Sequence, residues 1–341
     1  MKDRVLQNLK PDSLSVLLAP NTRRDFFRTA LATALAAGIS QERLLNAAAL
    51  RAPVQVDVRL PIPPRIQWEE LSGYCGECAI QQSALYYGAY VSEYACRSII
   101  NPNQKSQYLV GVHEAKVLSA LRLTYSIFDH TKVTKPEYQG YFLWIKQQLN
   151  MKRPVMIVCF VSDLEDPQYD HIMLATGFTS IDVTAYHASD KLFFNDNFSK
   201  TVIGRPASML NDNRKMRANG SLFDFCIPTD IDYGCAITGI QDSSGAALPV
   251  RMELNRNDEP NLIQKKPPVN LSAVLTVSGL QVGNKYALFR YNDYAKVPLK
   301  NYSKSAYSSV VNFVAKKTTE TFSQTILSNG VAIFRCLPAG L

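Results

Sequence analysis

The sequence predicts an α+β fold, in which helices and antiparallel strands share the first part of the chain and short strands fill the last. Two observations indicate this. Helical apolar spacing over 141–149 is followed by an uninterrupted apolar run over 155–161, the pattern of a buried strand. From about Gly245 the chain changes to short β-rich runs separated by turn residues, which is typical of a small β-sandwich.

The sequence pattern divides the chain into three regions. Residues 1–52 are expected to form a signal or pro-segment, residues 53–240 the main α+β domain, and residues 245–341 a β-sandwich accessory domain. With 341 residues, the chain is long enough for two domains with substantial cores.

Composition excludes several classes of protein. Hydrophobic residues make up 46% and charged residues 19% of the chain, an ordinary globular mixture. The net charge of +8 is scattered, without a basic stripe interleaved with aromatics, so no nucleic-acid partner is expected. After the N-terminal residues 1–52, no apolar run reaches the roughly 18 residues that a membrane-spanning helix needs, so no integral membrane span is expected.

The N-terminal segment resembles an export signal. Residues 22–28 read Thr-Arg-Arg-Asp-Phe-Phe-Arg, similar to the twin-arginine motif, and a moderately apolar, Ala-rich stretch follows over 29–39. We therefore expect an exported protein, periplasmic or secreted. The alternative is a helical pro-segment. Residues 53–64 are punctuated by Pro and predict an extended linker into the domain.

The residues that carry chemistry begin at 72–88. This stretch reads as a loop up to Cys75 and as a helix from Glu77, with Gly88 as its stop. Cys75 therefore lies where a loop becomes a helix, and the unpaired N–H groups there favour a thiolate over a thiol. A nucleophilic thiolate needs a base and an orienting group from elsewhere in the chain.

Helical patterns continue over 90–100, 112–123 and 141–149, before the strand at 155–161. Residues 169–178 then place His171 at the start of a second apolar strand.

A third strand, at 192–194, ends in Asn195-Asp196-Asn197, and the polar stretch 179–191 predicts a long hairpin loop between these two strands.

Cys-Gly-x-x-Ala-Ile running on to Tyr-Tyr-Gly at Gly88 resembles the nucleophile helix of papain-like cysteine peptidases, most closely the bacteriocin-leader-processing branch. The resemblance implies a Cys-bearing helix packed on an antiparallel sheet that bears His and Asp. It implies Cys75 as nucleophile, His171 as base, Asp196 as the orienting group and Gln67 as the oxyanion donor. The chain departs from that branch at Glu77, where Pro is usual.

Two assignments stay open within this resemblance. Cys78 is an alternative nucleophile, because papain uses the second Cys of a Cys-Gly-Ser-Cys pattern. Asn195 or Asn197 is an alternative orienting residue, because papain uses Asn. Of the seven cysteines, six are left for disulfides, or several are simply small buried side chains.

The resulting hypothesis is an exported cysteine peptidase or amidase that cleaves peptide or amide bonds of a peptide or protein substrate, with acyl transfer not excluded. It needs no metal or organic cofactor. One alternative is a thiol–disulfide oxidoreductase using Cys75 and Cys78. Another is a non-catalytic binding protein on a peptidase-like fold. The C-terminal region, where 277–286 resembles fibronectin-type-III modules, is expected to bind a surface or a carbohydrate.

Overall fold

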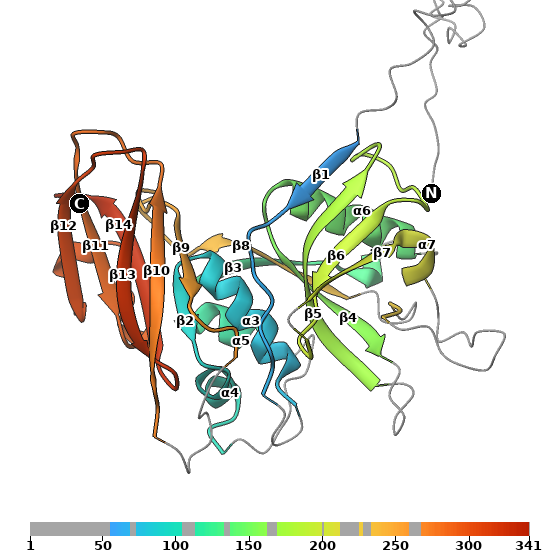
Figure 1. Ribbon diagram of the computed structural model, residues 1–341, viewed down its shortest axis with the longest axis horizontal. Coiled ribbons are helices and arrows are strands. Elements are labelled where there is room, and N and C mark those ends of the chain that lie inside the picture. Colours follow the sequence, from blue (N-terminus) through green and yellow to red (C-terminus); the bar gives the residue numbers. More distant parts are fainter. Residues whose placement is uncertain are drawn as a thin grey trace, which may run out of the picture. The chain divides into compact units, whose positions relative to one another are not determined.

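The computed structural model describes residues 55–68, 73–103, 113–132, 137–161, 169–199, 201–211, 225–227, 233–258 and 267–340. The predicted export segment, residues 1–52, lies outside them. Residues from Gln55 onward form one compact unit (Figure 1). The unit contains helices and antiparallel sheets, with a strand-rich C-terminal region, so the predicted α+β class is confirmed.

A seven-stranded antiparallel sheet organises the first part of the unit. Its strands run in the order β3-β8-β4-β5-β6-β7, and β1 extends the edge of β5 beyond the point where β4 ends. Gly177 permits this pairing, because a Cβ there would collide with the Val58 carbonyl of β1. The strands are β1 Val56–Arg59, β3 Leu123–Ile127, β4 Val155–Val161, β5 Tyr169–Ser180, β6 Lys191–Asn195, β7 Val202–Pro206 and β8 Gly234–Ile240.

Helices pack on this sheet and enclose the first core. The described helices are α3 Cys75–Tyr86, α4 Glu93–Ile100, α5 Glu114–Ala120, α6 Glu137–Asn150 and α7 Ala207–Leu210, with short 3-10 turns at His130–Lys132, Tyr294–Lys296 and Tyr302–Lys304. The helix predicted at 141–149 lies within α6, and the strand predicted at 155–161 is β4.

The helix predicted over 90–100 is wrong at its start. Residues Ala89–Val91 form the strand β2, and α4 begins only after Ser92, whose side chain accepts the Ala95 N–H at 3.1 Å. This N-cap starts a new helix, while β2 pairs with β14, far along the chain. The helix predicted over 112–123 is also too long, because β3 already begins at Leu123.

The C-terminal strands form two further antiparallel sheets. One has the order β13-β10-β9 and the other β12-β11-β14-β2. Side chains from both sheets share a second core that includes Leu275, Leu288 and Phe334. The bounds are β9 Val250–Leu254, β10 Asn270–Ser278, β11 Lys285–Tyr291, β12 Ser309–Val314, β13 Thr319–Leu327 and β14 Val331–Pro338.

The two regions also pack against each other. Phe289, Tyr291 and Ile333, from the C-terminal strands, belong to the same core cluster as Ile80 of α3. The domain boundary predicted at 240–245 therefore stays a prediction, because the described residues on its two sides share a core and a sheet.

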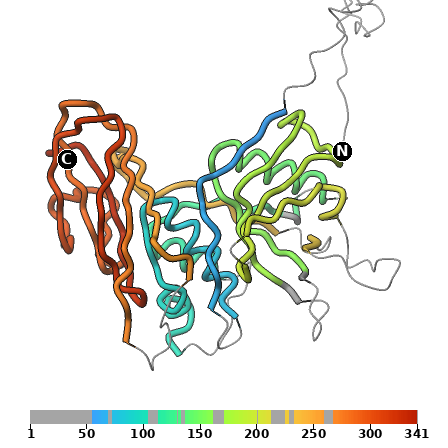
Figure 2. The backbone as a smooth tube through the Cα atoms, viewed as in Figure 1, coloured from blue at the N-terminus to red at the C-terminus, as the bar shows by residue number. Residues whose placement is uncertain are grey.

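The segment 55–68 runs from the sheet to the beginning of α3, as the blue trace in Figure 2 shows. The Leu60 N–H donates to the Thr176 carbonyl at 2.7 Å, and the Gln67 N–H donates to the Asn197 carbonyl at 2.9 Å. The expected linker is thus anchored along its length, which brings Gln67 to the end of β6.

Candidate functional site

Cys75 is the first residue of α3, as the sequence predicts. The helix is buried on almost all sides, but Cys75 itself is half-buried. The backbone N–H groups of Ile172 and Gly76 approach its sulfur. The Asn197 amide donates to the Cys75 carbonyl at 3.1 Å and to the Ile172 carbonyl at 2.9 Å, which ties the start of α3 to β5.

Burial opposes the thiolate that the sequence predicts at Cys75. Burial raises the pKa of Cys75 from 9.0 to about 12, although the N–H groups of Ile172 and Gly76 oppose the shift. A charge at a helix end gains about 0.3–1 kcal/mol, which is less than one pKa unit. Desolvation therefore outweighs the helix start, and Cys75 is a neutral thiol near pH 7.

Glu77, the residue at which the chain departs from the peptidase pattern, is held by a buried ion pair. Its carboxylate accepts a bond from Arg97 Nε at 2.6 Å, and the two side chains are 0% and 1% exposed. Arg97 also donates to the Gly73 carbonyl and lies over the Tyr74 ring, with its guanidinium carbon 3.5 Å from the ring centroid. The pair therefore fixes both the first turn of α3 and the loop that leads into Cys75.

His171 lies on β5, next to the residue whose N–H approaches the Cys75 sulfur. Its side chain is fully buried, and its ring stacks on Phe198 with centroids 4.3 Å apart and planes 13° apart. Burial lowers the pKa of His171 from 6.5 to about 3. The imidazole is therefore neutral near pH 7, the form that can accept a proton.

The Asn195–Asn197 triplet follows β6 as predicted, and the antiparallel pairing of β5 with β6 confirms the hairpin around 179–191. The Asp196 carboxylate accepts the Phe198 N–H at 2.9 Å, so it caps the turn that places the Phe198 ring on His171. Asn195 and Asn197 both bond Gln82 of α3, at 2.6 and 2.9 Å. The orienting role of Asp196 stays a prediction.

The side-chain amide of Gln67 is buried without a hydrogen-bond partner among the described residues. The residue is 3% exposed, yet neither side-chain amide atom has a hydrogen-bond partner among the described residues. Leaving such a group unpaired inside a protein costs about 1–3 kcal/mol. Its backbone is fixed to Asn197, and the next residue, Trp68, donates its N–H to Glu93 at 2.8 Å.

Cys78 faces the interior, away from the exposed end of the helix. It is 0% exposed, its thiol lies 3.6 Å from the Arg65 carbonyl, and burial raises its pKa well above the ordinary value. The seven cysteines form no disulfide with one another in the structure, and all except Cys75 are buried. The buried-thiol interpretation of the extra cysteines therefore describes this structure better than the disulfide interpretation.

Arg97 and Gln82 contribute to this arrangement and were not singled out from the sequence. Gln82 carries only a weak local signal, because it is one of several polar residues buried in α3, beside Gln81 and Ser83. Arg97 carries none, because its contact with Glu77 depends on how α4 packs on α3.

Within the part of the chain that the structure describes, no group of three or more His, Cys, Asp or Glu side chains is placed to hold a metal ion. None of the helices described there has the length and apolar character needed to cross a membrane.

No protein-family model matches this chain, and no curated protein matches it.

Proposed function

We propose that the chain is a cysteine hydrolase, a peptidase or amidase that acts on peptide or protein substrates through Cys75 and His171. The observation that carries the proposal is the buried side-chain amide of Gln67, which has no hydrogen-bond partner among the described residues and lies on the segment that leads to Cys75. A substrate oxyanion would supply the hydrogen-bond acceptor that this amide lacks. The neutral His171 and the Cys75 thiol beside Ile172 supply a base and a nucleophile.

The protonation states favour a particular order of events. With a thiol on Cys75 and a neutral imidazole on His171, the proton moves to His171 as the sulfur attacks the carbonyl carbon. The negative charge then develops on the carbonyl oxygen, where the Gln67 amide and the Cys75 backbone N–H would donate. His171 next protonates the leaving amine, and water hydrolyses the acyl-enzyme with the same base.

The proposal includes a papain-like fold for the first region and a β-sandwich for the C-terminal region. The Cys-bearing helix α3 packs against β5, which bears His171, and this arrangement supports a papain-like domain. The two C-terminal sheets around a shared core support a β-sandwich accessory module. Under this proposal the module binds a surface or a carbohydrate.

The proposal is tested by limiting-dose labelling of the full chain with an epoxysuccinyl peptidase inhibitor and mapping of the labelled cysteine by mass spectrometry. We expect label at Cys75, slowed at least about tenfold in His171→Ala, because a general base contributes about 10²–10⁴ in rate. His113→Ala is the matched control and should label like the parent chain. Labelling of Cys75 that is equally fast without His171 would contradict the proposal.

Two other outcomes assign the alternatives. His171-dependent label on Cys78 would keep a hydrolase and move the nucleophile. A Cys75–Cys78 disulfide that forms and breaks with added dithiol would support an oxidoreductase instead.

Gln67→Met separates a catalytic amide from a merely structural one. Removing an unpartnered buried amide should raise the free energy of unfolding by about 1–2 kcal/mol. The same change should slow acylation of Cys75 by an activated ester about 10²-fold or more, as expected for loss of an oxyanion donor. Loss of stability with unchanged acylation would assign Gln67 a structural role only.

A further inference from the structure

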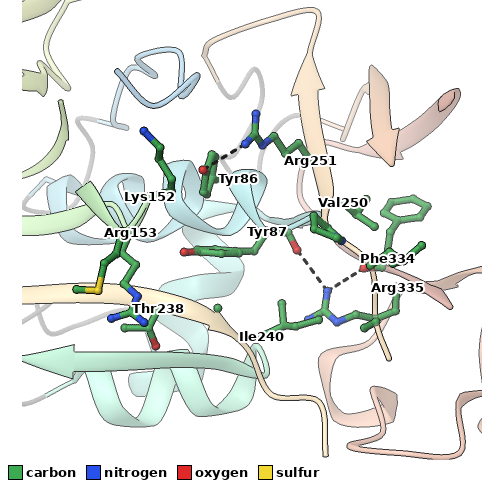
Figure 3. Close-up of a pocket in the computed structure, with 15 residues that line it drawn as sticks. Tyr86, Tyr87, Lys152, Arg153, Thr238, Ile240, Val250, Arg251, Phe334 and Arg335 are labelled. Carbon is green, nitrogen blue, oxygen red and sulfur yellow. Dashed lines mark hydrogen bonds between the residues drawn. The ribbon is translucent and has the colours of Figure 1, made fainter. Parts of the chain in front are cut away.

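A cavity of about 340 Å³ lies at the C-terminal end of α3, the end opposite Cys75. Its walls come from α3, the turn between α6 and β4, and strands β8, β9 and β14 (Figure 3). Residues 75 and 86 are about 17 Å apart along the helix, at 1.5 Å per residue, so the cavity is separate from the proposed catalytic site. Its size is within the range of small-molecule sites, about 300–1,000 Å³.

The lining of this cavity carries charge of one sign. Lys152, Arg153, Arg251 and Arg335 line it, and none of the fifteen described residues around it is Asp or Glu. In Figure 3, Lys152 and Arg153 approach from one side and Arg251 and Arg335 from the other. Cations gathered around a concave site without compensating carboxylates attract an anion.

Arg335 is a buried cation in the wall of this cavity, and its hydrogen bonding is incomplete. Its side chain is 1% exposed, and two of its guanidinium nitrogens, Nε and Nη2, have no hydrogen-bond partner among the described residues. The third, Nη1, donates to the carbonyls of Phe334 at 2.8 Å and Tyr87 at 3.4 Å (Figure 3). A guanidinium buried without a full set of acceptors is costly, and a bound anion would remove that cost.

Neighbouring groups meet this need only in part. The Tyr302 hydroxyl faces the Arg335 guanidinium and favours its charge, but the pair lacks the geometry of a hydrogen bond. The Asp242 charge also favours the Arg335 cation, but no hydrogen bond joins the two, and the Asp242 carboxylate accepts bonds from Ser244 and from the Ala247 N–H at 2.8 Å. Burial also lowers the pKa of Arg335 to about 10, which is the expected result of an under-compensated cation.

The remaining walls select the body of the ligand. The residues that line the same cavity include the aromatic and aliphatic side chains of Tyr86, Ile240, Val250 and Phe334. Arg251 lies over the Tyr86 ring, with its guanidinium carbon 4.7 Å from the ring centroid, and donates to the Tyr86 hydroxyl at 3.3 Å. A bare inorganic anion would leave these apolar walls uncovered.

We propose that this cavity binds a small molecule with a flat apolar body and an anionic head, of the class of aromatic carboxylates. The head lies between Arg251 and Arg335, and the ring lies against Tyr86 and Phe334. The site is distinct from Cys75 and does not depend on the proposed hydrolase activity.

The experiment is an isothermal titration of the full chain with 2-naphthoate and with 2-naphthamide, which has the same rings and no charge. We expect 2-naphthoate to bind at least about tenfold more tightly, because charge-assisted bonds to arginine are roughly twice as strong as neutral ones. Equal affinity for the two compounds overturns the proposal. So does the absence of a heat of binding for 2-naphthoate up to about 10 mM, which is about tenfold weaker than millimolar binding.

Two variants locate the head group. Arg251→Met and Arg335→Met should each weaken 2-naphthoate at least about fivefold and leave 2-naphthamide nearly unchanged, since each removes one charged donor. Arg251 is exposed, so its variant remains informative if Arg335→Met disturbs the core. Arg256→Met, an exposed arginine outside the cavity, is the matched control. Unchanged 2-naphthoate affinity in Arg251→Met overturns the assigned pose and with it the proposal.

Discussion

At the scale of single residues, burial decides the chemistry of the proposed site. Desolvation raises the pKa of Cys75 and lowers that of His171, so both groups are held in their neutral forms. A helix start gives a smaller effect of opposite sign on the thiol. Resting reactivity is therefore expected to be low, with proton transfer coupled to substrate attack.

The buried His171 predicts a pH dependence of stability. In the unfolded chain the imidazole binds a proton below about pH 6.5, whereas in the folded chain it does so only near its pKa of about 3. Between these values the unfolded state holds more protons, so stability falls as the pH falls. Between pH 6.5 and 5, His171 should account for about 1.6 kcal/mol of lost unfolding free energy.

Urea denaturation of the parent chain and of His171→Phe at several pH values checks this. The variant cannot titrate at that position, and the carboxylates contribute equally to both proteins. Its stability should decline less steeply below pH 6.5. Parallel declines in the two proteins would show that the His171 pKa is not lowered in the folded state.

At the scale of elements, α3 is fixed at both ends. At its start, Arg97 of α4 joins the helix through Glu77 and the preceding loop through Gly73. At its end, Gly88 has φ 68°, and a Cβ there would lie 2.7 Å from the Val250 side chain of β9. The position of Cys75 therefore depends on contacts from α4 and from a C-terminal strand.

Breaking the ion pair at the start of α3 should be more harmful than removing it whole. Arg97→Met leaves the Glu77 carboxylate buried without its counter-charge and should cost about 3–5 kcal/mol of unfolding free energy. The double variant Glu77→Leu/Arg97→Met should recover part of that loss. Urea denaturation of the two single variants and the double variant checks this, with the exposed pair partner Arg256→Met as a control that changes little. Strict additivity would mean that the pair is not coupled in the folded chain.

Elements specified by local patterns were predictable, and those specified by distant partners were not. The helix at 141–149 and the strand at 155–161 carry their own apolar periodicity, and the structure contains both. The segment 89–91 is only three residues long, too short to show a periodic pattern, and it forms a strand because it pairs with β14. Strand β13 at 319–327 was missed although its alternation is visible, because its inward positions include Glu320 and Gln324 rather than only apolar residues.

The same distinction holds for the sites. The positions of Cys75 at a helix start and His171 on a strand follow from short motifs. The Glu77–Arg97 pair joins two different helices, and the cavity around Arg335 is built from segments far apart in the sequence, so no local pattern indicates either of them.

At the scale of the whole molecule, the region from Gln55 onward is joined by more than a linker. Core residues of the large-sheet region and of the C-terminal region belong to one cluster. In the second C-terminal sheet, β14 pairs with β11 on one side and with β2 on the other. Cooperative unfolding of the two parts follows from this shared packing.

Two buried thiols report on this cooperativity. Cys235 lies on β8 of the large sheet and Cys336 on β14 of the C-terminal region, and both are 0% exposed. Brief alkylation across a urea series, read by mass spectrometry, should show both becoming reactive over the same range of urea. Separated transitions would show that the C-terminal region unfolds independently.

The pairing of β2 with β14 has a consequence for the synthesis of the protein. Val91 pairs with Val331, so 240 residues (331 − 91) separate the partners. At about 5–20 residues per second, a ribosome needs roughly 12–48 s to add them. During that interval the strand that follows the Cys75 helix has no sheet to join, and its edge is open to any other chain. Newly made protein is therefore expected to need protection from association until residue 331 has emerged, and ribosomes that stall before it would release chains with that edge uncovered.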